Sequence, residues 1–398
     1  MQNKPISPPS MPNYSLQAVE EFQTRFHTIP HIYRSPGRIN LIGEHIDYNN
    51  GWVMPAGIDK ETTFCFLENG TETFHIYSIN QQEEISFTLE NYNSITTTWA
   101  KFIIGVIDEF LKKGKTIPAF DAVLEGNVPF GSGLSSSASL ECAVAFGLND
   151  RFQLDFSRVE LAQLAQAAEN NYVGVNCGIM DQFASVFSKE NHVFKLDCDS
   201  LTFEYFPCDL GQYTLILANS LVHHSLADSE YNTRRMECES ALLKLGNGKK
   251  INFRDLQKNE LEQYRKLLSP IEFNRIQFVL EEIERVDEAA KALQKQDFEK
   301  LGKLLYGSHE GLQHLYEVSC KELDFMVDFA REFDGILGSR MMGGGFGGCT
   351  INLIEETKAE KFMDQLSQAY QARFGIKPEF YPVKIGEGSS KVQLELKE

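Results

Sequence analysis

The stretch GNVPFGSGLSSSASLECAVAF, residues 126–146, does most to determine the fold of this chain. Three glycines and a proline lead into a run of serines, and the serines lead into an apolar, helix-forming segment. A glycine-rich turn that enters a helix brings unpaired N–H groups and the positive end of the helix dipole to one place. Such a place binds anions, and the hydroxyls of Ser135–Ser137 suit a nucleotide phosphate together with Mg²⁺. The alternative is a loop whose serines only cap the helix.

A second informative stretch, SPGRINLIGEHIDYNNGWVMPAGID, covers residues 35–59. It places Arg38, Glu44, His45 and Asp47 in a segment that glycines and prolines mark as turns. Carboxylates accept hydrogen bonds and histidine can donate or accept them, so this set suits a ligand with several neighbouring hydroxyls, such as a sugar. The alternative is a surface loop with a solvated charge cluster.

A third stretch, AAENNYVGVNCGIMDQFAS, covers residues 167–185. Glu169 ends one predicted helix and Asp181 begins another, with Gly174 and Gly178 in the turn between them. One carboxylate beside a phosphate site can ligate Mg²⁺, and a second can accept the proton of an attacking hydroxyl. Taken singly, each carboxylate could instead serve as a helix cap.

Two glycine patterns imitate nucleotide-binding motifs. Gly114-Lys115-Thr116 matches the end of a Walker A loop, but Glu109 occupies the position that needs a glycine. The run GGGFGG, residues 343–348, satisfies G-x-G-x-x-G, yet a strand-like segment follows where a dinucleotide site needs a helix. Five glycines in six positions predict instead a close approach of this backbone to a ligand or to another domain.

Composition limits the classes of function. A chain of 398 residues predicts about two domains. The net charge of −18 argues against an extended nucleic-acid or anionic-membrane surface. Residues 1–17 are polar and proline-rich and predict a loosely packed arm, and no stretch is apolar enough for a signal peptide or a membrane span. The eight cysteines contain no CxxC pair, which predicts reduced thiols in a cytoplasmic protein rather than zinc ligands or disulfides.

Helix and strand signals alternate along the chain. An amphipathic helix is predicted over Ile103–Leu111, ended by Gly114, and an S-x-x-E capping box at Ser157 begins a helix through Glu169. Residues 276–332 read as helical. A composition shift near Asp197–Gly211 suggests a domain boundary. Strands are predicted over Phe120–Leu124, His192–Leu196, Tyr213–Leu217 and Cys349–Ile354.

Together the three stretches resemble the three motifs of the small-molecule kinase family that groups galactokinase, homoserine kinase, mevalonate kinase and phosphomevalonate kinase. Residues 129–138 match the family's P-x3-G-L-x-S-S-A phosphate loop at every letter. Within the family, GRINLIGEHIDYNNG at 37–51 resembles the signature of galactokinases, and residues 219–238 and 309–324 resemble further galactokinase segments. The resemblance runs from about Tyr33 to Ile351. It implies an α+β fold of two domains, with the active site in the cleft between them. The predicted domains are residues 14–205, ribosomal-protein-S5-like, and residues 206–398, ferredoxin-like.

The resemblance also implies roles for single residues. Asp181 is the catalytic carboxylate, with Arg38 beside it. Ser137 and Glu169 are the Mg²⁺ ligands. The implied sugar contacts are Glu44, His45, Asp47, Gly178 and Tyr231. The implied ATP contacts are Gly131, Ser132, Gly133, Leu134, Ser135, Ser136, Ser137 and Ala138 in the phosphate loop, and Gly344, Gly345, Phe346 and Gly347 in the third motif.

The implied reaction is the ATP-dependent phosphorylation of the anomeric hydroxyl of α-D-galactose, with Mg²⁺ as cofactor. Aiming that hydroxyl in line at the γ-phosphorus supplies most of the acceleration. Asp181 takes or orients the hydroxyl proton, while Arg38 keeps that carboxylate ionised and offsets charge on the transferred group. Galactose and ATP are the expected partners, without nucleic acid or membrane, and a cytoplasmic monomer is expected.

Two alternative functions stay open. One is a related kinase that acts on N-acetylgalactosamine or arabinose, because room at C2 or C5 of the sugar is not readable from the sequence. The other is a catalytically silent sensor that binds sugar and ATP. The intact Ser137-Ala138 pair, Arg38 and Asp181 favour an enzyme.

At four positions the chain departs from the residue that is usual in galactokinases, and none of these departures removes a catalytic group. Ile46 and Met342 stand where threonine is common, and Lys321 stands where proline is frequent. Asn170 replaces the usual histidine after the predicted metal ligand Glu169, so we expect it to alter the surroundings of Mg²⁺.

Overall fold

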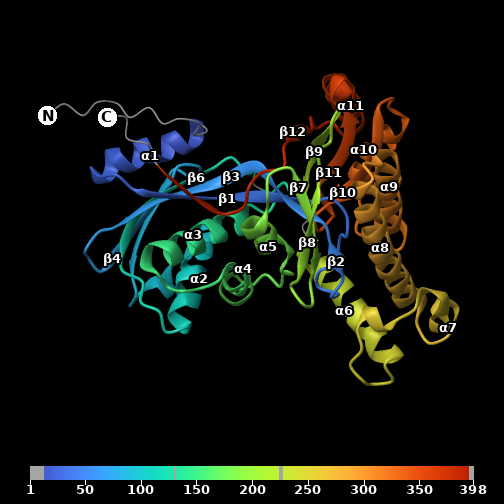
Figure 1. The fold of residues 1–398 in the computed structure, drawn as a ribbon, viewed down its shortest axis with the longest axis horizontal. Helices are drawn as coiled ribbons and strands as arrows, with labels where there is room; N and C mark the ends of the chain where they lie inside the picture. The colour runs from blue at the N-terminus through green and yellow to red at the C-terminus, as the bar shows by residue number, and fades with distance from the viewer. Residues whose placement is uncertain (1–12, 130, 224–226, 394–398) are drawn as a thin grey trace.

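The computed structural model describes residues 13–129, 131–223 and 227–393 and shows two lobes side by side (Figure 1). The first lobe is a sheet with α1 on one face and α2, α3 and α4 on the other. The second lobe combines a smaller sheet with the long helices α8 and α9. The predicted mixture of helices and strands is confirmed in both lobes.

The first lobe is built on a six-stranded sheet in the order β13-β1-β3-β6-β4-β5, in which β4 and β6 run parallel. Two apolar cores form because both faces of the sheet are covered. The strands are β1 (His31–Asn40), β3 (Pro55–Glu68), β4 (Thr73–Ser78), β5 (Glu83–Thr88), β6 (Phe120–Gly126) and β13 (Ser390–Val392). The covering helices are α1 (Asn13–Phe26), α2 (Thr98–Lys112), α3 (Ser136–Phe152) and α4 (Arg158–Ala167).

The second lobe holds a four-stranded antiparallel sheet in the order β10-β11-β9-β12. Helices α10 and α11 pack on one face, and α8 and α9 pack on the other. The strands are β9 (Tyr213–His223), β10 (Ile336–Met342), β11 (Gly347–Glu355) and β12 (Glu379–Val383). The helices are α6 (Ala227–Leu245), α7 (Leu261–Arg265), α8 (Pro270–Gln294), α9 (Phe298–His314), α10 (Lys321–Glu332) and α11 (Ala359–Phe374).

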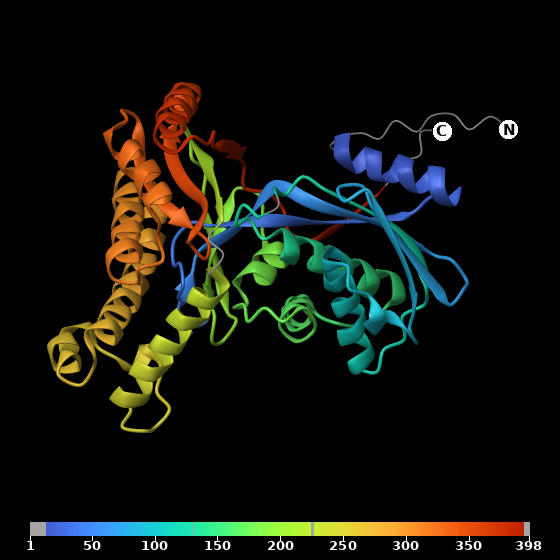
Figure 2. The ribbon, with the colours of Figure 1, turned by 180° about the vertical axis from the view of Figure 1, so that it is seen from behind.

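One hydrophobic core joins the two lobes. It contains Ile39 of β1 and Ile58 of β3 together with Val286 of α8 and Leu312 of α9. Figure 2 shows β1 and β3 reaching from the first lobe toward the second. A small sheet, β2-β7-β8, and helix α5 (Met180–Phe187) belong to this junction. The strands of that sheet are β2 (Trp52–Val53), β7 (His192–Asp197) and β8 (Phe203–Pro207).

Most predicted elements are confirmed. The helix predicted over Ile103–Leu111 is part of α2, and Gly114 follows it with a φ of +74°. Ser157 forms the predicted capping box with Glu160 at the start of α4. The four predicted strands lie within β6, β7, β9 and β11, and residues 276–332 contain α9, α10 and most of α8.

Two local predictions are wrong. The loosely packed arm ends earlier than predicted, because α1 begins at Asn13 and Ser15 is buried with its hydroxyl 2.9 Å from that of Thr63; residues 1–12 lie outside the described residues. The helix predicted to end at Glu169 continues as a π-helical turn to Val173. Such turns occur often at functional sites.

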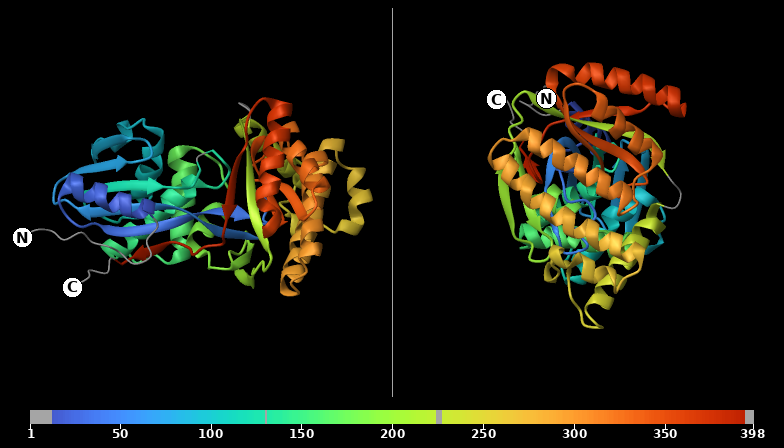
Figure 3. Two further views of the ribbon diagram at one scale, coloured as in Figure 1. Left: turned by 90° about the horizontal axis from the view of Figure 1, so that it is seen from above. Right: turned by 90° about the vertical axis from the view of Figure 1, so that its right-hand side faces the viewer.

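The division into residues 14–205 and 206–398 stays a prediction. Two features bear on it. The hairpin of β7 and β8 spans the predicted boundary, and β13 returns from the second lobe to pair with β1. In Figure 3 the red C-terminal segment can be followed back along the first lobe. Within the described residues, no helix is both long and apolar enough to cross a membrane.

Candidate active site

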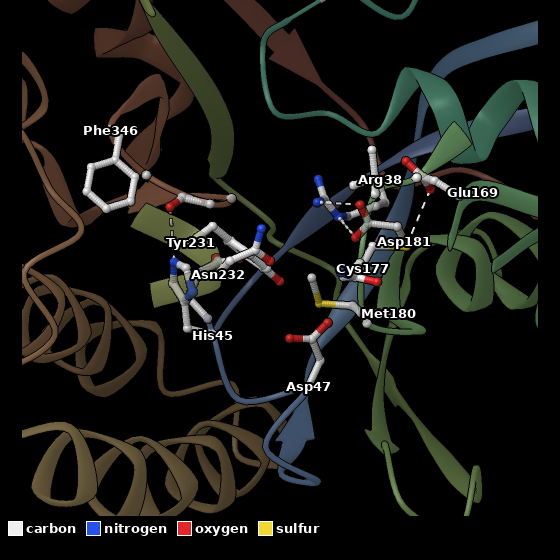
Figure 4. A pocket seen from close by; sticks show the side chains of 18 residues that line it. Arg38, His45, Asp47, Glu169, Cys177, Met180, Asp181, Tyr231, Asn232 and Phe346 are labelled. Carbon is white, nitrogen blue, oxygen red and sulfur yellow. Dashed lines mark hydrogen bonds and ion pairs between the residues drawn. The ribbon is translucent and has the colours of Figure 1, made fainter. Parts of the chain in front are cut away.

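A cavity of about 400 Å³ joins two of the three predicted stretches, those around Arg38 and Asp181, with the glycine run at 343–348 (Figure 4). The serine-rich stretch lies beside this cavity, where the hydroxyl of Ser135 donates to Asp181. The walls of the cavity come from β1 and the loop after it, from the start of α5, from α6, and from the turn between β10 and β11. We call residues 37–51 the signature loop, residues 129–138 the phosphate loop and residues 343–348 the glycine loop. The cavity is lined by Arg38, Glu44, His45, Asp47, Glu169, Gly174, Val175, Asn176, Cys177, Gly178, Met180, Asp181, Tyr231, Asn232, Gly343, Gly344, Gly345 and Phe346.

Asp181 and Arg38 form a two-point ion pair in this cavity. The Nε of Arg38 lies 2.8 Å from Oδ1 of Asp181, and Nη2 lies 3.0 Å from Oδ2. The hydroxyl of Ser135 also donates to Oδ2, and Arg38 donates to the carbonyl of Gly133. The Arg38 side chain is only 6% exposed. The pair therefore fixes the Asp181 carboxylate directly beside the phosphate loop, because a bidentate guanidinium contact sets direction as well as distance.

The phosphate loop has the backbone geometry of an anion site. Gly131, Gly133 and Ser135 alternate with other residues and have φ values of 70°, 77° and 59°. Alternation of left-handed residues with ordinary ones turns successive N–H groups toward one point, and α3 begins directly afterwards at Ser136. The side chains of Ser135–Ser137 are half-buried, whereas those of Ser132, Leu134 and Ala138 are buried in the protein. The last three can contribute only their backbone to a ligand.

Glu169 lies next to the phosphate loop and close to the Asp181 carboxylate. Its Oε1 accepts from the hydroxyl of Ser137 at 3.1 Å, and its Oε2 accepts from Gln182 at 2.6 Å. Burial, followed by the nearby Asp181 carboxylate, raises the pKa of Glu169. Behind it, burial and the neighbouring Glu169 raise the pKa of Glu141 well above its usual range, and Glu141 Oε1 has no hydrogen-bond partner among the described residues. This excess of buried acidic oxygen fits a divalent cation.

In the described part of the chain, no group of three or more His, Cys, Asp or Glu side chains is arranged to hold a metal ion. Ser137 and Glu169 would therefore supply only two protein ligands. Mg²⁺ commonly takes one or two protein ligands and completes its shell with phosphate oxygens and water. The predicted pair fits that pattern.

Glu44 is fixed by a residue that the sequence did not single out. Its Oε2 accepts from Nη1 of Arg340 at 2.6 Å, and both side chains are almost fully buried. Arg340, on β10, also donates to the carbonyls of Asn40, Leu41 and Met341. The signature loop is thus held by a guanidinium of the second lobe. The sequence around Arg340 does not predict this contact, because the two residues are almost 300 positions apart.

Asp47 and Gly178 depend on each other. A Cβ atom on Gly178 would lie 1.8 Å from Oδ2 of Asp47, so only glycine allows the carboxylate to lie against this backbone. Burial in the cavity, followed by the charge of Asp181, raises the pKa of Asp47 to about 7. In Figure 4 the Asp47 side chain projects into the cavity below the Arg38–Asp181 pair.

The ring of His45 is engaged on both sides. Nδ1 lies 2.8 Å from the hydroxyl of Tyr48, and Nε2 lies 3.1 Å from the carbonyl oxygen of Gly344. Burial lowers the pKa of His45 to about 3. The Tyr231 ring, from α6, lies 5.3 Å from the His45 ring and 5.2 Å from that of Tyr48. Any sugar contact of His45 would therefore come from its backbone, where φ is +61°.

The glycine loop lies against the phosphate loop and the second lobe. A Cβ atom on Gly345 would lie 2.1 Å from the carbonyl oxygen of Val318, and one on Gly343 would lie 3.7 Å from that of Gly133. The Phe346 N–H donates to the carbonyl of Val318 at 2.8 Å. The tightest approach of the glycine run is thus to Val318 of its own lobe, and its contact with the phosphate loop of the other lobe is an ordinary van der Waals one.

A second cavity, of about 580 Å³, opens on the other side of the phosphate loop. Its walls include Ser136 and Ser137 of α3 and Trp99 and Phe102 of α2. Its remaining walls are Thr62, Ser78, Asn80, Gln81, Thr98, Leu124, Glu125, Gly126, Asn127, Val128, Pro129 and Leu140. Outside residues 126–146, none of these residues belongs to a stretch whose sequence predicts ligand binding. The only local signal was Trp99 beside an amphipathic helix, and packing alone explains such a residue.

The four unusual positions lie outside the reacting groups. Ile46 and Met342 are buried in the shared core, and Lys321 is exposed at the start of α10. Asn170 lines neither cavity, and its Oδ1 accepts from the N–H of Cys177 at 3.0 Å and from the thiol at 3.2 Å. The Asn170 side chain is therefore linked to the Glu169 carboxylate through Cys177, whose thiol lies 3.5 Å from Oε2 of Glu169.

Three family models match the chain. They are the galactokinase galactose-binding signature over residues 20–66, the GHMP kinases N terminal domain over residues 101–189 and the GHMP kinases C terminal model over residues 289–372. The galactokinases of Thermosipho africanus and Thermotoga maritima are each 44% identical to the chain, over 90% of its length and 99% of theirs.

Solved structures agree with these matches. A Lactococcus lactis galactokinase complexed with galactose superposes with a TM-score of 0.90 at 36% identity, covering 94% of this chain and 98% of that one. A Methanococcus jannaschii mevalonate kinase gives a TM-score of 0.66 at 16% identity, over 90% of this chain and 99% of that one. The second likeness is one of fold alone.

Proposed function

Because the chain belongs to the galactokinase family and has the two-domain α+β fold of the GHMP kinases, as predicted, we propose that it transfers the γ-phosphoryl group of ATP to the anomeric hydroxyl of α-D-galactose. The observation that carries this proposal is the place of Asp181. Its carboxylate, oriented by Arg38 and Ser135, lies between a cavity lined by the signature loop and the anion site of the phosphate loop. A hydroxyl bound in the first cavity would face a phosphate bound at the second.

The transfer exchanges one bond for another. The anomeric oxygen forms a bond to the γ-phosphorus while the bond from that phosphorus to the bridging oxygen breaks, and ADP leaves with the electron pair. Asp181 accepts the hydroxyl proton. Its bidentate pairing with Arg38 fixes the carboxylate for that task, and the guanidinium offsets negative charge on the group in transit. Most of the acceleration comes from positioning the two substrates.

The sugar would be held by groups from both lobes. Glu44 and Asp47 supply acceptors for hydroxyl groups, and Tyr231 of the second lobe lines the same cavity. The Arg340 contact orients the Glu44 carboxylate and pairs its charge in a buried place, where an unpaired charge would be strongly unfavourable. Gly178 leaves room for Asp47 to face the ligand.

ATP would lie across the phosphate loop with its base in the second cavity. The loop's N–H groups and the α3 N-terminus would hold the phosphates, and Trp99, Phe102 and Leu140 offer an apolar surface for a flat base. Ser137 and Glu169 would hold Mg²⁺, which supplies charge neutralisation on the phosphates when bound. A monomeric state and a cytoplasmic location stay predictions.

The proposal is tested by ATP-dependent phosphorylation of galactose, glucose, N-acetylgalactosamine and arabinose. Galactose is expected to be the best substrate. Asp181→Ala is expected to reduce kcat by about 10²–10⁴-fold, the usual loss for a proton acceptor. Asp334→Ala serves as the matched control, because the Asp334 side chain is 93% exposed and pairs only with Lys358 on the surface.

Each other outcome has a distinct meaning. A preference for N-acetylgalactosamine or arabinose would keep the reaction type and overturn the assigned sugar. Binding of galactose and ATP without turnover would identify the silent sensor and overturn the assignment as an enzyme.

A further inference from the structure

The His45 ring joins two loops that are 299 residues apart in the chain. One is the signature loop, which carries Glu44 and Asp47, and the other is the glycine loop. Figure 4 shows the ring with its hydrogen bond to the Gly344 carbonyl, while Arg38 and Asp181 lie at the other side of the cavity. The ring's contacts thus lie within the protein rather than at the reacting centre.

The direction of every hydrogen bond around His45 follows from its partners. A carbonyl oxygen only accepts, so Nε2 must carry a proton toward Gly344. The ring is neutral because burial lowers the pKa of His45 to about 3, so Nδ1 must accept. The Tyr48 hydroxyl, 2.8 Å away, is therefore the donor to Nδ1.

The chain of donors continues into the second lobe. Since the Tyr48 proton is used, its oxygen accepts from the hydroxyl of Tyr316 at 3.0 Å. The Tyr316 oxygen in turn accepts from the thiol of Cys238 at 3.2 Å and from Asn49 at 3.4 Å. We call Tyr48, Tyr316 and Cys238 the tyrosine relay. Tyr316 and Cys238 are fully buried, so the relay has a fixed end inside the protein.

We propose that His45 is a positioning residue whose ring, oriented by the tyrosine relay, holds the Gly344 carbonyl and so places the glycine loop against the phosphate loop for transfer. The relay is anchored independently of any ligand, because Arg234 donates to the carbonyl of Tyr316 at 2.8 Å. This inference rests on the proposed function. It assigns to His45, a residue of the signature loop, an effect on the binding of ATP through the glycine loop.

The glycine loop transmits the constraint through its backbone. In a trans peptide the carbonyl and the next N–H point in opposite directions, so fixing the Gly344 carbonyl on His45 also fixes the Gly345 N–H on the opposite side. Gly343, on the other flank of Gly344, lies next to Gly133 of the phosphate loop. Gly344 itself lines the first cavity, but its neighbour Gly343 contacts the phosphate loop. A loosened Gly344 would therefore disturb the bound phosphates through Gly343, whereas Glu44 in the first cavity keeps its own support from Arg340.

Tyr48→Phe tests the proposal with the removal of one oxygen atom. The variant deprives Nδ1 of its donor and Tyr316 of its acceptor while the ring packing stays. We expect kcat/KM for ATP to fall about tenfold, equivalent to about 1.4 kcal/mol, with the dissociation constant for galactose unchanged within about twofold. Tyr316→Phe should also lower kcat/KM for ATP, but by less, because Tyr48 can still donate to His45.

Tyr33→Phe is the matched control. Tyr33 is also fully buried and its hydroxyl donates to Asp150 at 2.7 Å, but it lines neither cavity. It should leave both constants unchanged. A His45→Gln variant can still donate to Gly344 and should retain more activity than His45→Leu. Adding Tyr48→Phe to His45→Leu should cause no further loss, because both act through one contact.

Two results would overturn the proposal. The first is weaker galactose binding by Tyr48→Phe with an unchanged KM for ATP, which would place the His45 ring in sugar recognition. The second is an unchanged kcat/KM for ATP in both Tyr48→Phe and His45→Leu. Calorimetric binding of a non-hydrolysable ATP analogue and of galactose separates this test from the proposed function, because it reads the glycine loop even if galactose is not phosphorylated.

Discussion

The two cavities on either side of the phosphate loop differ in how they are built. The first is lined by charged and hydrogen-bonding groups, several of them, such as Glu44 and Asp47, on one short loop. The second has a single charged residue, Glu125, among its lining residues and combines neutral polar side chains with large apolar ones such as Trp99 and Phe102; its walls come from β3, β4, α2, β6 and α3. A site that needs directional groups concentrates them in a recognisable pattern, whereas a flat apolar surface can be assembled from positions that also serve the core.

Gly178→Ala should cause the largest loss on the polar side. The added methyl group would overlap Oδ2 of Asp47, which lies 1.8 Å from the built Cβ atom, so the carboxylate must leave its place. We expect the KM for galactose to rise about 100-fold, since one hydrogen bond to a charged group contributes about 1.5–3 kcal/mol. The KM for ATP should change little. Initial rates over a galactose series measure both.

Gly307→Ala is the control for that variant. A Cβ atom on Gly307, in α9, meets only the side chain of Arg285 at 3.8 Å, an ordinary contact. The substitution should leave galactose kinetics unchanged. A KM for galactose that is equal in Gly178→Ala and Gly307→Ala would show that the position of Asp47 does not matter for the sugar.

Trp99→Ala tests the second cavity and should affect the KM for ATP rather than the KM for galactose. Loss of an aromatic platform for a base removes about 1–3 kcal/mol, so we expect the KM for ATP to rise about tenfold with the KM for galactose unchanged. Lys101→Ala, on the same helix and lining neither cavity, should leave both constants alone. A rise in the KM for galactose rather than ATP would assign the second cavity to a different ligand.

The same difference explains what could be predicted from the sequence. The family, the fold class and the residues around Asp181 follow from motifs whose side chains act in short stretches, and the structure brings Arg38, Asp47, Glu169 and Asp181 into one cavity as expected. Arg340 was missed because its role depends on a contact between lobes. Trp99 was missed because an apolar residue on a helix gives the same sequence pattern whether it binds a ligand or packs in the core.

Misplaced local predictions have similar causes. The polar composition of residues 1–17 predicts a loosely packed arm. However, Ala18, Val19 and Phe22 pack on the sheet, and this packing stabilises α1 from Asn13 onward. No strand is predicted at β13, because its pairing with β1 joins distant positions and no local pattern encodes it. In each case tertiary contacts decided the outcome against local composition.

The pH dependence of the sugar side should be moderate and should disappear with Asp47. Burial and the Asp181 charge raise the Asp47 pKa to about 7, with Glu44 adding to the rise and Arg38 opposing it. The ionised carboxylate is the form that accepts hydrogen bonds from two hydroxyls, and its fraction grows from about one-tenth at pH 6 to about nine-tenths at pH 8. The KM for galactose should therefore fall about ninefold over that range.

The Asp47→Asn variant decides whether this carboxylate is responsible. It should bind galactose more weakly, with a KM that no longer varies between pH 6 and pH 8. A variant that keeps the full pH dependence would assign the titration to another group. The KM for ATP, measured in parallel, should show no matching change, because Asp47 does not line the second cavity.

The smallest effect is expected at Asn170, which lines neither cavity. Its side chain joins the two ends of the loop from Asn170 to Cys177, so Asn170→Ala should lower the free energy of unfolding by about 1 kcal/mol, the value of one internal hydrogen bond. Activation by Mg²⁺ should stay within about twofold, because the Glu169 carboxylate keeps its contacts with Ser137 and Gln182. Thermal unfolding and a Mg²⁺ titration of the rate measure the two quantities. A tenfold weaker response to Mg²⁺ at unchanged stability would mean that Asn170 orients the metal ligand after all, and that the polar side of the site extends one layer deeper than its lining residues.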